Sequence, residues 1–450
     1  MQHVMMVGAG SVGGYFGARL ARTHPNVSFL LRSSTLAAVK TDGLTVRSAA
    51  GSFTVRPEAA DDPRALPVPD LIILSVKAYD LDRALDQLEP VLTDRTTILT
   101  LQNGVDTEDR ILARLGRDCV VGGVAFIYSK IASPGVIDHY KKGAVAIGEM
   151  MGHESGRVLR IQELFTQAGI PCQLTKDVRR SKWEKMCWNC VFNPLTVVID
   201  DKVAKALDHP ELAHVIQGLV EEVMAVAAAQ KVPLPSDMAE RVVKWSQELR
   251  DIHTSMYDDW KAGRPTEIDY LNGYVVQKGR EHGITTPLNE AFTALIKVIT
   301  VRERVGPGII RIDGAVVQPL SLDRQSIAQL PSEYHVPDVS AVMPGMSGRA
   351  IRVSGLLEVP ALAIQADHVT FHSADGQYAA TLTLKQARDY GLLVYEVEGQ
   401  PLPDARGGPF RLITPGLGDL CANVKAVGRV EVREGSGKDT RPPEDARTHC

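Results

Sequence analysis

A lysine and two asparagines recur every four residues in the stretch 182–194. On a helix, Lys185, Asn189 and Asn193 would form one row, angularly distinct from the apolar face of the same segment. An ammonium group and two amides in a row offer several donors to a small, anionic, oxygen-rich ligand. Such a row can also be a solvated helix face, and Pro194 is expected to end or kink the helix. The pattern therefore predicts either a binding site or a solvent-exposed helix face.

A second group of polar residues lies between 255 and 273. Ser255 and Asp259 are four residues apart and would share one face of a helix. Glu267 would open the next helix, where the positive end of the helix dipole stabilises a carboxylate. Ordinary helix capping is the alternative explanation for these side chains.

The segment Val4–Val7 is expected to be a strand that runs into a glycine-rich turn and then a helix. The turn has the pattern G-x-G-x-x-G. Its first glycine permits the tight turn, its second lets the backbone approach a pyrophosphate, and its third lets helix and strand pack. The helix N-terminus adds free N–H groups for phosphates. A plain strand–helix turn is the alternative, but the context favours a dinucleotide site formed by Gly8, Ala9, Gly10, Ser11, Val12 and Gly13.

The residues about twenty positions further on predict which dinucleotide binds, because NAD sites usually place Asp or Glu there to bind the ribose 2′-hydroxyl group. Here the second strand ends in Leu31-Arg32-Ser33-Ser34, without a carboxylate. A guanidinium pairs with a 2′-phosphate, whereas a carboxylate repels it. Arg32 therefore favours NADP(H), with a solvated surface arginine as the alternative.

The apolar pattern predicts the domain that would hold this turn. Residues 1–175 alternate short apolar runs with helical stretches, as in a parallel sheet with helices on both faces. This first domain is thus predicted to be α/β and Rossmann-type. The expected strands are Val4–Val7, Val27–Leu31, Leu71–Val76 and Thr97–Leu101, and the expected helices include Tyr15–Arg22 and Leu81–Leu92.

Residues 176–305 are predicted to form an all-α second domain. Apolar residues spaced by three and four define one helical face over Glu211–Gln230. Further helical segments are expected over Asp237–Tyr257 and Ile268–His282. The lysine–asparagine row and the acidic cluster both fall in this domain.

A linker is expected at Gly306-Pro307-Gly308, and a β-rich domain over 308–432 is expected to follow it. Residues 433–450 are polar and rich in Pro and Gly, so they are expected to form a disordered tail. The expected strands of the β-rich domain are Ile309–Ile312, Ala350–Val353, His368–His372 and Ala380–Leu384.

The composition argues against several classes of protein. The chain has 450 residues, a formal net charge of −4 and 44% hydrophobic residues, so no nucleic-acid partner is expected. Its apolar stretches, such as Val120–Ile127, are too short to span a bilayer. Six cysteines do not make a disulfide framework, and Cys187 and Cys190 are expected to be buried thiols. No metal site, no membrane partner and a cytoplasmic location are therefore expected.

Residues 1 to about 305 resemble the ketopantoate reductase (2-dehydropantoate 2-reductase) family. Five dispersed motifs occur in the family's order, which is specific for the family and less specific for its substrate. Two of them are the glycine turn and the lysine–asparagine row. The others are Ser75-Val76-Lys77-Ala78-Tyr79, Gln102-Asn103-Gly104-Val105 and Ser255-Met256…Asp259…Glu267-Ile268-Asp269-Tyr270.

The resemblance implies a role for each matching residue. Lys185 corresponds to the catalytic lysine, Asn103 to a residue that touches both cofactor and substrate, and Glu267 to the acid that orients both. A further family asparagine, about ten residues beyond Asn193, is missing, because this chain has Asp200-Asp201-Lys202-Val203 there. The other implied roles are substrate binding by Asn189, Asn193 and Ser255 and cofactor binding by Arg32 and Lys77.

The activity implied by the resemblance is NADPH-dependent reduction of 2-dehydropantoate to pantoate, a step of the pantothenate pathway. Hydride addition builds negative charge on the ketone oxygen, which protonated Lys185 can stabilise before it donates the proton. Two alternatives stay open: a reductase of another small 2-oxo acid, and a non-catalytic NADPH-binding regulator whose output is the C-terminal domain. The presence of Lys185 with Glu267 disfavours the regulator. The expected partner is a small 2-oxo acid, with a homodimer as a candidate assembly.

Residues 308–432 resemble, more remotely, the molybdopterin-binding domain of sulfite oxidase-like proteins. That family holds molybdenum through a cysteine ahead of the stretch that matches Arg349–Leu357, and residues 336–348 contain no cysteine. Without a thiolate ligand, a scaffold or ligand-sensing domain without molybdenum is expected. The short matching stretches include Ile312-Asp313-Gly314-Ala315-Val316, Val353-Ser354-Gly355-Leu356-Leu357 and Gly408-Pro409-Phe410-Arg411-Leu412.

Overall fold

The computed structural model divides into two units, each described by itself below. The first unit comprises Met1–Trp260 and Pro265–Val298, and the second comprises Lys261–Arg264 and Ile299–Cys450. The structure describes residues 2–116, 118–262, 264–302, 308–317, 319–343, 345–360, 362, 365–374, 378–437 and 439–442.

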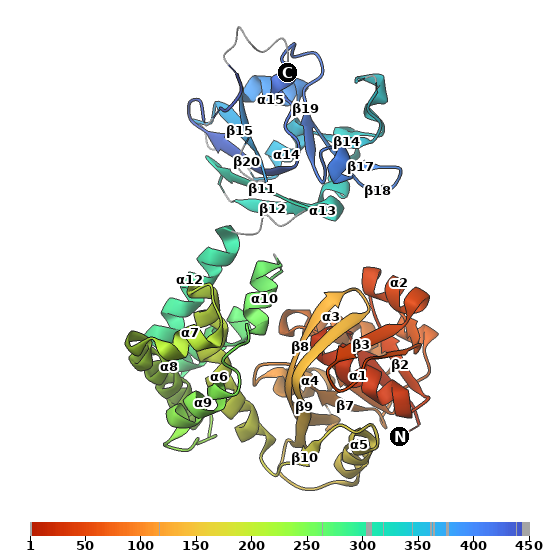
Figure 1. Ribbon diagram of the computed structural model, residues 1–450, viewed down its shortest axis with the longest axis vertical. Helices are drawn as coiled ribbons and strands as arrows, with labels where there is room; N and C mark the ends of the chain where they lie inside the picture. The colour runs from red at the N-terminus through yellow and green to blue at the C-terminus, as the bar shows by residue number, and fades with distance from the viewer. Residues whose placement is uncertain are drawn as a thin grey trace. The chain divides into compact units, whose positions relative to one another are not determined.

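The first unit begins with a ten-stranded mixed sheet in the order β4-β3-β9-β8-β7-β6-β1-β2-β5, with β10 paired to β9 (Figure 1). Its centre is the parallel set β2, β1, β6 and β7, and every residue of these four strands is buried. The strands are β1 Val4–Val7, β2 Val27–Leu30, β3 Leu44–Ser48, β4 Phe53–Val55, β5 Glu58–Ala60, β6 Leu71–Leu74, β7 Thr97–Thr100, β8 Val120–Ser133, β9 Val136–Glu149 and β10 Cys172–Leu174. The predicted Rossmann-type sheet is therefore confirmed.

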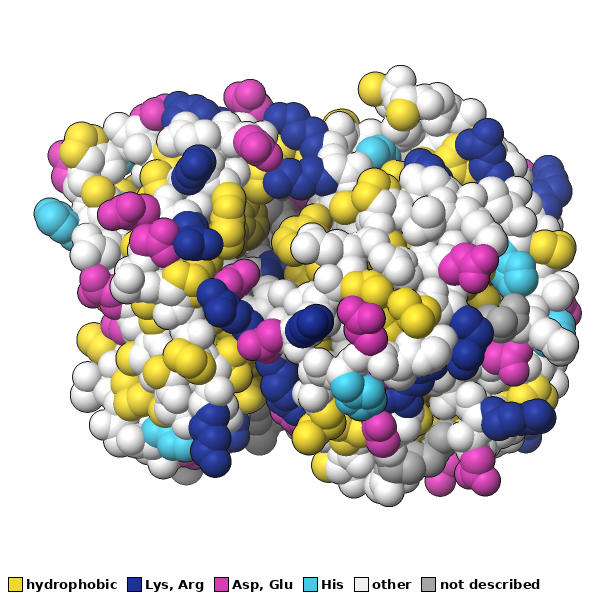
Figure 2. All heavy atoms as spheres, turned by 90° about the horizontal axis from the view of Figure 1, so that it is seen from below, with side chains coloured by type: hydrophobic (Ala, Val, Ile, Leu, Met, Phe, Trp, Pro, Cys, Tyr) yellow, Lys and Arg dark blue, Asp and Glu magenta, His cyan; other side chains and the backbone are white. Residues whose placement is uncertain are grey.

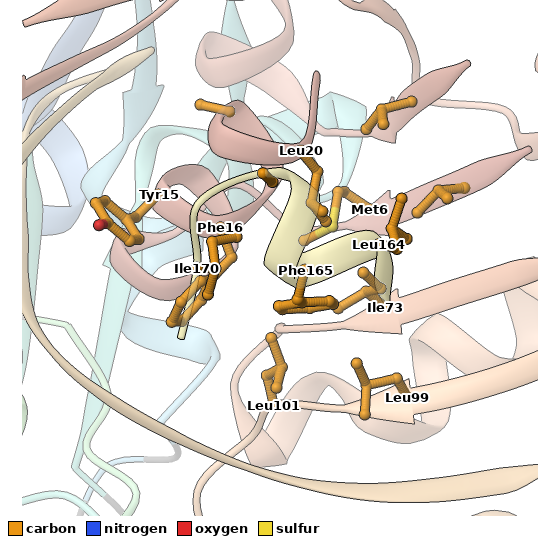
Figure 3. Packing of buried hydrophobic residues seen from close by; sticks show 14 of the residues in the cluster. Met6, Tyr15, Phe16, Leu20, Ile73, Leu99, Leu101, Leu164, Phe165 and Ile170 are labelled. Atoms are coloured by element: carbon orange, nitrogen blue, oxygen red, sulfur yellow. The ribbon is translucent and has the colours of Figure 1, made fainter. Parts of the chain in front are cut away.

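Helices cover the sheet and bury its apolar side chains. Figure 3 shows Phe16 of α1 and Phe165 of α5 in one cluster with strand residues such as Met6 and Ile73. The ring centroids of the two phenylalanines are 6.2 Å apart. Each large side chain removed from water there stabilises the fold by about 1.5–3 kcal/mol. The helices of this part are α1 Ser11–Thr23, α2 Ser33–Asp42, α3 Leu81–Leu88, α4 Thr107–Leu115 and α5 Gly156–Gln167, with 3-10 turns η1 Pro63–Ala65, η2 Ala78–Asp80 and η3 Glu89–Val91.

A long hairpin, β8–β9, was not among the predicted strands. Each of its strands has 14 residues, and β9 pairs in parallel with β3, which carries the sheet beyond its parallel core. Residues 120–125 of β8 are buried, but the rest of the strand is half-buried or exposed. The apolar stretch Val120–Ile127 thus covers only the first part of β8, and the rest of the strand has neither a continuous apolar run nor strict alternation.

The second part of the first unit is helical, as predicted. The segment Asp237–Tyr257, predicted to be helical, contains α9 and the start of α10, separated by residues 248–254. The elements are α6 Val178–Val198, α7 Val203–Asp208, α8 Pro210–Ala229, α9 Met238–Gln247, α10 Ser255–Lys261, η4 Ile268–Tyr270, α11 Asn272–Glu281 and α12 Pro287–Arg302. One of them, α8, has the length and composition of a membrane span, but it packs against α6, α9 and α11.

Pro194 does not end α6, which continues to Val198; of the two predicted outcomes, a helix end or a kink, the helix end is excluded. A proline at position 194 cannot donate to the carbonyl four residues earlier, that of Cys190. Asn272 of α11 supplies the missing donor, since its Nδ2 lies 2.9 Å from the Cys190 carbonyl oxygen. The contact between helices thus satisfies the carbonyl and lets the helix run on.

The second unit is β-rich, as predicted, and contains two five-stranded sheets around a shared core. One sheet has the order β12-β11-β20-β15-β16, and the other has the order β13-β14-β17-β18 with β19 paired to β17. The strands are β11 Ile309–Gly314, β12 Leu320–Asp323, β13 His335–Val336, β14 Arg349–Arg352, β15 His368–Ser373, β16 Ala379–Thr383, β17 Leu392–Val397, β18 Gln400–Pro401, β19 Arg411–Ile413 and β20 Val427–Arg433, and the helices are α13 Arg324–Ala328, α14 Val353–Glu358 and α15 Leu384–Tyr390.

The predicted tail, 433–450, contains ordered residues. Thr440 N donates to Ala379 O at 2.9 Å, and Arg441 Nη1 lies 2.7 Å from Asp419 Oδ2 with its side chain only 7% exposed. The expectation of disorder is thus wrong for the described part of 433–442, because polar side chains can be held by backbone and ion-pair contacts without an apolar pattern. Residues 443–450, like Gly306 and Pro307 of the expected linker, lie outside the described residues.

Candidate active site

The glycine turn joins β1 to α1 with the geometry that the sequence predicts. Gly8 has a φ of +91°, which only glycine adopts readily. A Cβ at Gly13 would collide with Ser75 Oγ at the end of β6, whereas a Cβ at Gly10 would meet no atom within 4 Å. The turn therefore packs closely on one side and faces open space at Gly10, where a pyrophosphate can approach the N–H groups of the first turn of α1.

Arg32 lies at the N-cap of α2, directly after β2. Its Nη2 is 3.0 Å from Asp80 Oδ2, and the two side chains are 40% and 28% exposed. The loop after β6 thus brings a carboxylate to the point where the local sequence contains none. Arg32 is accessible to a cofactor phosphate, but it is already paired.

Glu267, at the N-cap of η4, connects three groups from two loops of the sheet. Its Oε1 accepts from Ala78 N at 2.9 Å and its Oε2 from Lys77 Nζ at 3.2 Å. Asn103 Nδ2, in the loop after β7, donates to the same Oε2 at 3.4 Å. The carboxylate of Glu267, in the helical part, therefore contacts both Lys77 and Asn103. All three residues were predicted as site residues.

Lys77 also donates to Asp259 Oδ2 of α10, at 2.6 Å. Burial alone would lower the pKa of Lys77 and raise that of Glu267. The charges of Glu267 and Asp259 outweigh burial and raise the pKa of Lys77, while Lys77, Ala78 N and Asn103 lower that of Glu267. Lys77 is therefore protonated and Glu267 ionised at neutral pH. Sequence reasoning placed Asp259 on the same helix face as Ser255 but assigned it no role.

Lys185 reaches from α6 to the sheet, where its Nζ donates to the carbonyl oxygen of Ala125 in β8 at 2.8 Å. Burial, reinforced by the charge of Lys182, lowers the pKa of Lys185 to about 8, while the carboxylate of Glu267 opposes the shift. A lysine of this kind is still mostly protonated at pH 7, and it gives up its proton more readily than an exposed lysine.

Asn189 and Asn193 follow Lys185 on α6 and are only 4% and 2% exposed, so the row is not a solvated face. Among the described residues, no side chain or carbonyl group hydrogen-bonds to either side-chain amide. Neither amide is among the fully buried polar atoms without a partner in the described residues, so these amide groups stay accessible to water or a ligand. Two such amides one and two helical turns from Lys185 are suited to hold a small polar ligand.

Ser255, the last predicted site residue, begins α10 and is exposed. It shares this helix with Asp259, which is buried and bound to Lys77. Ser255 is therefore connected to the described site residues through α10. Asp200, the first residue of the stretch that lacks the expected asparagine, has a φ of +49° and accepts a hydrogen bond from the Tyr257 hydroxyl at 2.9 Å.

The sequence analysis missed a buried ion pair between α6 and α4. Lys182 Nζ donates to Glu108 Oε1, which also accepts from Thr100 Oγ1, and the two charged side chains are 4% and 0% exposed. Glu108 lies five residues after Asn103, and Lys182 lies three residues before Lys185. The pair thus ties the loop of Asn103 to the helix of Lys185. No local spacing pattern could reveal a pair separated by 74 residues.

The face in Figure 2 shows that the two lobes of the first unit leave a hollow between them, and that blue lysine and arginine side chains gather along it.

The other predicted pair of the region, Cys187 and Cys190, is buried, and burial raises the pKa of both thiols. These cysteines are therefore inert packing residues, as expected.

A molybdenum centre of the family that the second unit resembles needs a cysteine thiolate as a ligand. The sole cysteine of residues 308–432 is Cys421, and it is disulfide-bonded, so it offers no thiolate. Among the described residues, no group of three or more His, Cys, Asp or Glu side chains is placed to hold a metal ion. The residues present therefore do not fit a thiolate-bound molybdenum ion.

Comparison with known proteins matches both units to families. Residues 4–152 match the family "Ketopantoate reductase PanE/ApbA" and residues 177–300 its C-terminal part, while residues 349–440 match the "Oxidoreductase molybdopterin binding domain". The 2-dehydropantoate 2-reductase of a Nostoc strain is 28% identical over 307 residues, which are 67% of this chain and 96% of that protein.

Solved structures show the same relationship. The 2-dehydropantoate 2-reductase of Geobacter metallireducens superposes with a TM-score of 0.63 at 31% identity, covering 66% of this chain and 99% of that one. A ternary complex of D-mandelate dehydrogenase with NADH and anilino(oxo)acetate shares the fold, with a TM-score of 0.63 at 23% identity. The chain therefore belongs to the ketopantoate reductase family of oxidoreductases and carries a molybdopterin-binding-type domain after its reductase part.

Proposed function

We propose that this protein reduces 2-dehydropantoate to pantoate with NADPH, a step of the pantothenate pathway, and that Lys185 donates the proton. The observation that carries the proposal is the α6 row, in which a lysine with a lowered pKa precedes two nearly buried asparagines whose amides have no protein partner among the described residues. The family relatives named 2-dehydropantoate 2-reductase support the substrate class.

The chemistry follows from the charges that develop. The reduced nicotinamide supplies a hydride to the C2 ketone of the substrate. The Lys185 ammonium stabilises the negative charge that grows on the ketone oxygen and then transfers its proton to it. Asn189 and Asn193 hold the polar groups of the substrate, while Glu267 fixes Asn103 and Lys77 at the end of the sheet.

The cofactor site is proposed to run from Arg32, at the end of β2, past the glycine turn to Asn103. Gly8, Ala9, Gly10, Ser11, Val12 and Gly13 form the turn that faces the pyrophosphate, and the open space at Gly10 fits it. Lys77 is proposed to contact the cofactor from the cluster around Glu267.

The deciding experiment is a panel of small 2-oxo acids, with the loss of reduced-nicotinamide absorbance as the readout. The proposal requires 2-dehydropantoate to have the highest kcat/KM. A different 2-oxo acid is the second candidate, because the stretch Asp200–Val203 lacks the asparagine that the resemblance leads one to expect. If no 2-oxo acid is reduced although NADPH binds, the proposed reaction is refuted.

Replacing Arg32 with alanine should weaken NADPH binding about tenfold or more and leave NADH binding nearly unchanged, since only NADPH carries the 2′-phosphate and a charged hydrogen bond contributes about 1.5–3 kcal/mol. Calorimetric dissociation constants for both cofactors measure this. Equal losses for both would show that Arg32 does not bind the phosphate.

The pH dependence of reduction should follow the titration of Lys185. Because the ammonium form donates the proton and its pKa lies at about 8, kcat/KM for the 2-oxo acid should be level below pH 7 and fall tenfold per pH unit well above pH 8. The reverse oxidation needs the free amine, so it should rise over the same range. In Lys185→Arg the guanidinium does not titrate here, and a wild-type profile in that variant would exclude Lys185 as the titrating group.

The second unit is proposed to be dispensable for this reaction. All residues assigned above, from Gly8 to Glu267, belong to the first unit. A chain that ends at Arg302 should therefore keep kcat within about threefold, provided that circular dichroism shows it to be folded. Elemental analysis of the whole protein should find no stoichiometric molybdenum. A folded but inert shortened chain, or molybdenum at one per chain, would contradict the assignment.

A further inference from the structure

The ion pair between Arg32 and Asp80 places an acid at the adenosine end of the proposed cofactor site. Asp80 belongs to η2, in the loop after β6, and its Oδ2 accepts from Arg32 Nη2 at 3.0 Å. Asp80 is the only charged partner of Arg32 among the described residues. The Asp80 carboxylate therefore contacts the guanidinium of Arg32, which directly follows the end of β2.

That point is where Rossmann-type sites distinguish their cofactors. An acid there accepts a hydrogen bond from the ribose 2′-hydroxyl group and repels a 2′-phosphate, and an arginine does the opposite. The acid usually stands at the end of β2 itself, whereas here it comes from a segment 48 residues later. This chain thus combines both kinds of group at one position.

We propose that Asp80 is a specificity-determining residue of the cofactor site, which reduces the preference for a 2′-phosphorylated dinucleotide and lets the protein accept NADH as well as NADPH. The inference rests on the proposed function, in which Arg32 faces the 2′ position. It deepens that function by adding a second residue with the opposite effect.

Asp80 is expected to weaken the binding of a 2′-phosphate in two ways. One donor of the Arg32 fork is occupied by Asp80, so a phosphate must share the guanidinium with the carboxylate or displace it. A 2′-phosphate bound to Arg32 also lies a few ångströms from the negative charge of Asp80, at a partly exposed site. Like charges a few ångströms apart repel each other even in water, and salt screens part of this repulsion, so we expect an effect of about three- to tenfold.

The test measures the adenosine end alone and then the whole cofactor. Calorimetry with adenosine 2′,5′-bisphosphate and with 5′-AMP is applied to the wild-type chain, Asp80→Asn and Arg32→Ala, and is repeated with NADPH and NADH. Asp80→Asn should bind the two 2′-phosphorylated ligands about three- to tenfold more tightly, with 5′-AMP and NADH changed by less than about twofold. Asp82→Asn is the matched control, since it removes an equal charge two residues away, where Asp82 pairs with Arg110.

Each outcome has one meaning. Unchanged affinity for adenosine 2′,5′-bisphosphate in Asp80→Asn, alongside a selective loss in Arg32→Ala, overturns the inference and leaves the proposed cofactor site standing. An equal gain in Asp82→Asn also overturns it, because the effect would then be general charge. If Arg32→Ala loses no selectivity either, the placement of the 2′ position at Arg32 fails, and the cofactor part of the proposed function fails with it.

Discussion

Replacing Lys185 with alanine is expected to lower the turnover number about 10²–10⁴-fold, equivalent to about 3–5 kcal/mol of barrier, while NADPH binds with its normal affinity. The ammonium group is the proposed proton donor, and in the proposed reaction it also stabilises the developing alkoxide. Its neighbours Asn189 and Asn193 stay in place, so the KM for the 2-oxo acid should change much less than kcat.

Steady-state rates and a calorimetric NADPH titration measure the two effects separately. Asn189→Ala provides the matched control on the same helix, because it removes a proposed substrate contact without a titrating group. It should raise KM more than it lowers kcat. Near-native turnover in Lys185→Ala would remove this residue from the mechanism.

Replacing Glu267 with alanine is expected to have the second largest effect, on both stability and turnover. The change leaves Ala78 N without its acceptor and Lys77 with Asp259 as its remaining carboxylate partner. Breaking a buried ion pair costs about 3–5 kcal/mol. Since the Lys77 side chain is 34% exposed, solvent screening reduces the expected loss in the free energy of unfolding to about 2–3 kcal/mol. Turnover should fall about 10²-fold, because Asn103 loses the group that orients it.

Urea unfolding of the whole chain and steady-state kinetics measure these two quantities. Asp259→Asn is the control, since it removes the other carboxylate from Lys77 but leaves the hydrogen bonds of Ala78 and Asn103 to Glu267. An equal loss of turnover in both variants would mean that the charge balance of Lys77 matters and the orientation by Glu267 does not.

The pH dependence of stability follows from the same carboxylate. Lys77, Ala78 N and Asn103 hold the pKa of Glu267 below its usual value, despite its burial. A carboxyl group with a lowered pKa in the folded state adds stability above its unfolded pKa, near 4.3, and loses this contribution as the pH falls through the folded pKa. The free energy of unfolding of Glu267→Ala should therefore approach that of the wild-type chain as the medium is acidified below pH 4.

Much of the fold could be predicted from the sequence because it depends on local patterns. The four central strands of the first sheet are continuous apolar runs of four residues, and a run buried on both faces needs no other signal. The glycine turn is local in the same sense, since the φ of Gly8 and the close packing at Gly13 restrict each position to one residue type. The spacing of Lys185, Asn189 and Asn193 is local too, because residues four apart on any helix lie in one row.

What the sequence could not determine depends on segments that are far apart in the chain and meet only in the folded state. The elements that pack over α6 determine whether Lys185, Asn189 and Asn193 are solvent-exposed or buried. The lowered pKa of Lys185 depends on that burial. Pro194 breaks a helix by local rules, yet α6 continues because Asn272, 82 residues away from Cys190, donates to the carbonyl that the proline leaves without its helical partner. The charges at the end of β2 also depend on distant segments. The local sequence contributes only Arg32, and Asp80 is added because η2 packs beside it. Hydrogen bonds and ion pairs act over about 3 Å in space, whatever the separation along the chain, and for that reason only the tertiary structure shows which side chains share the site.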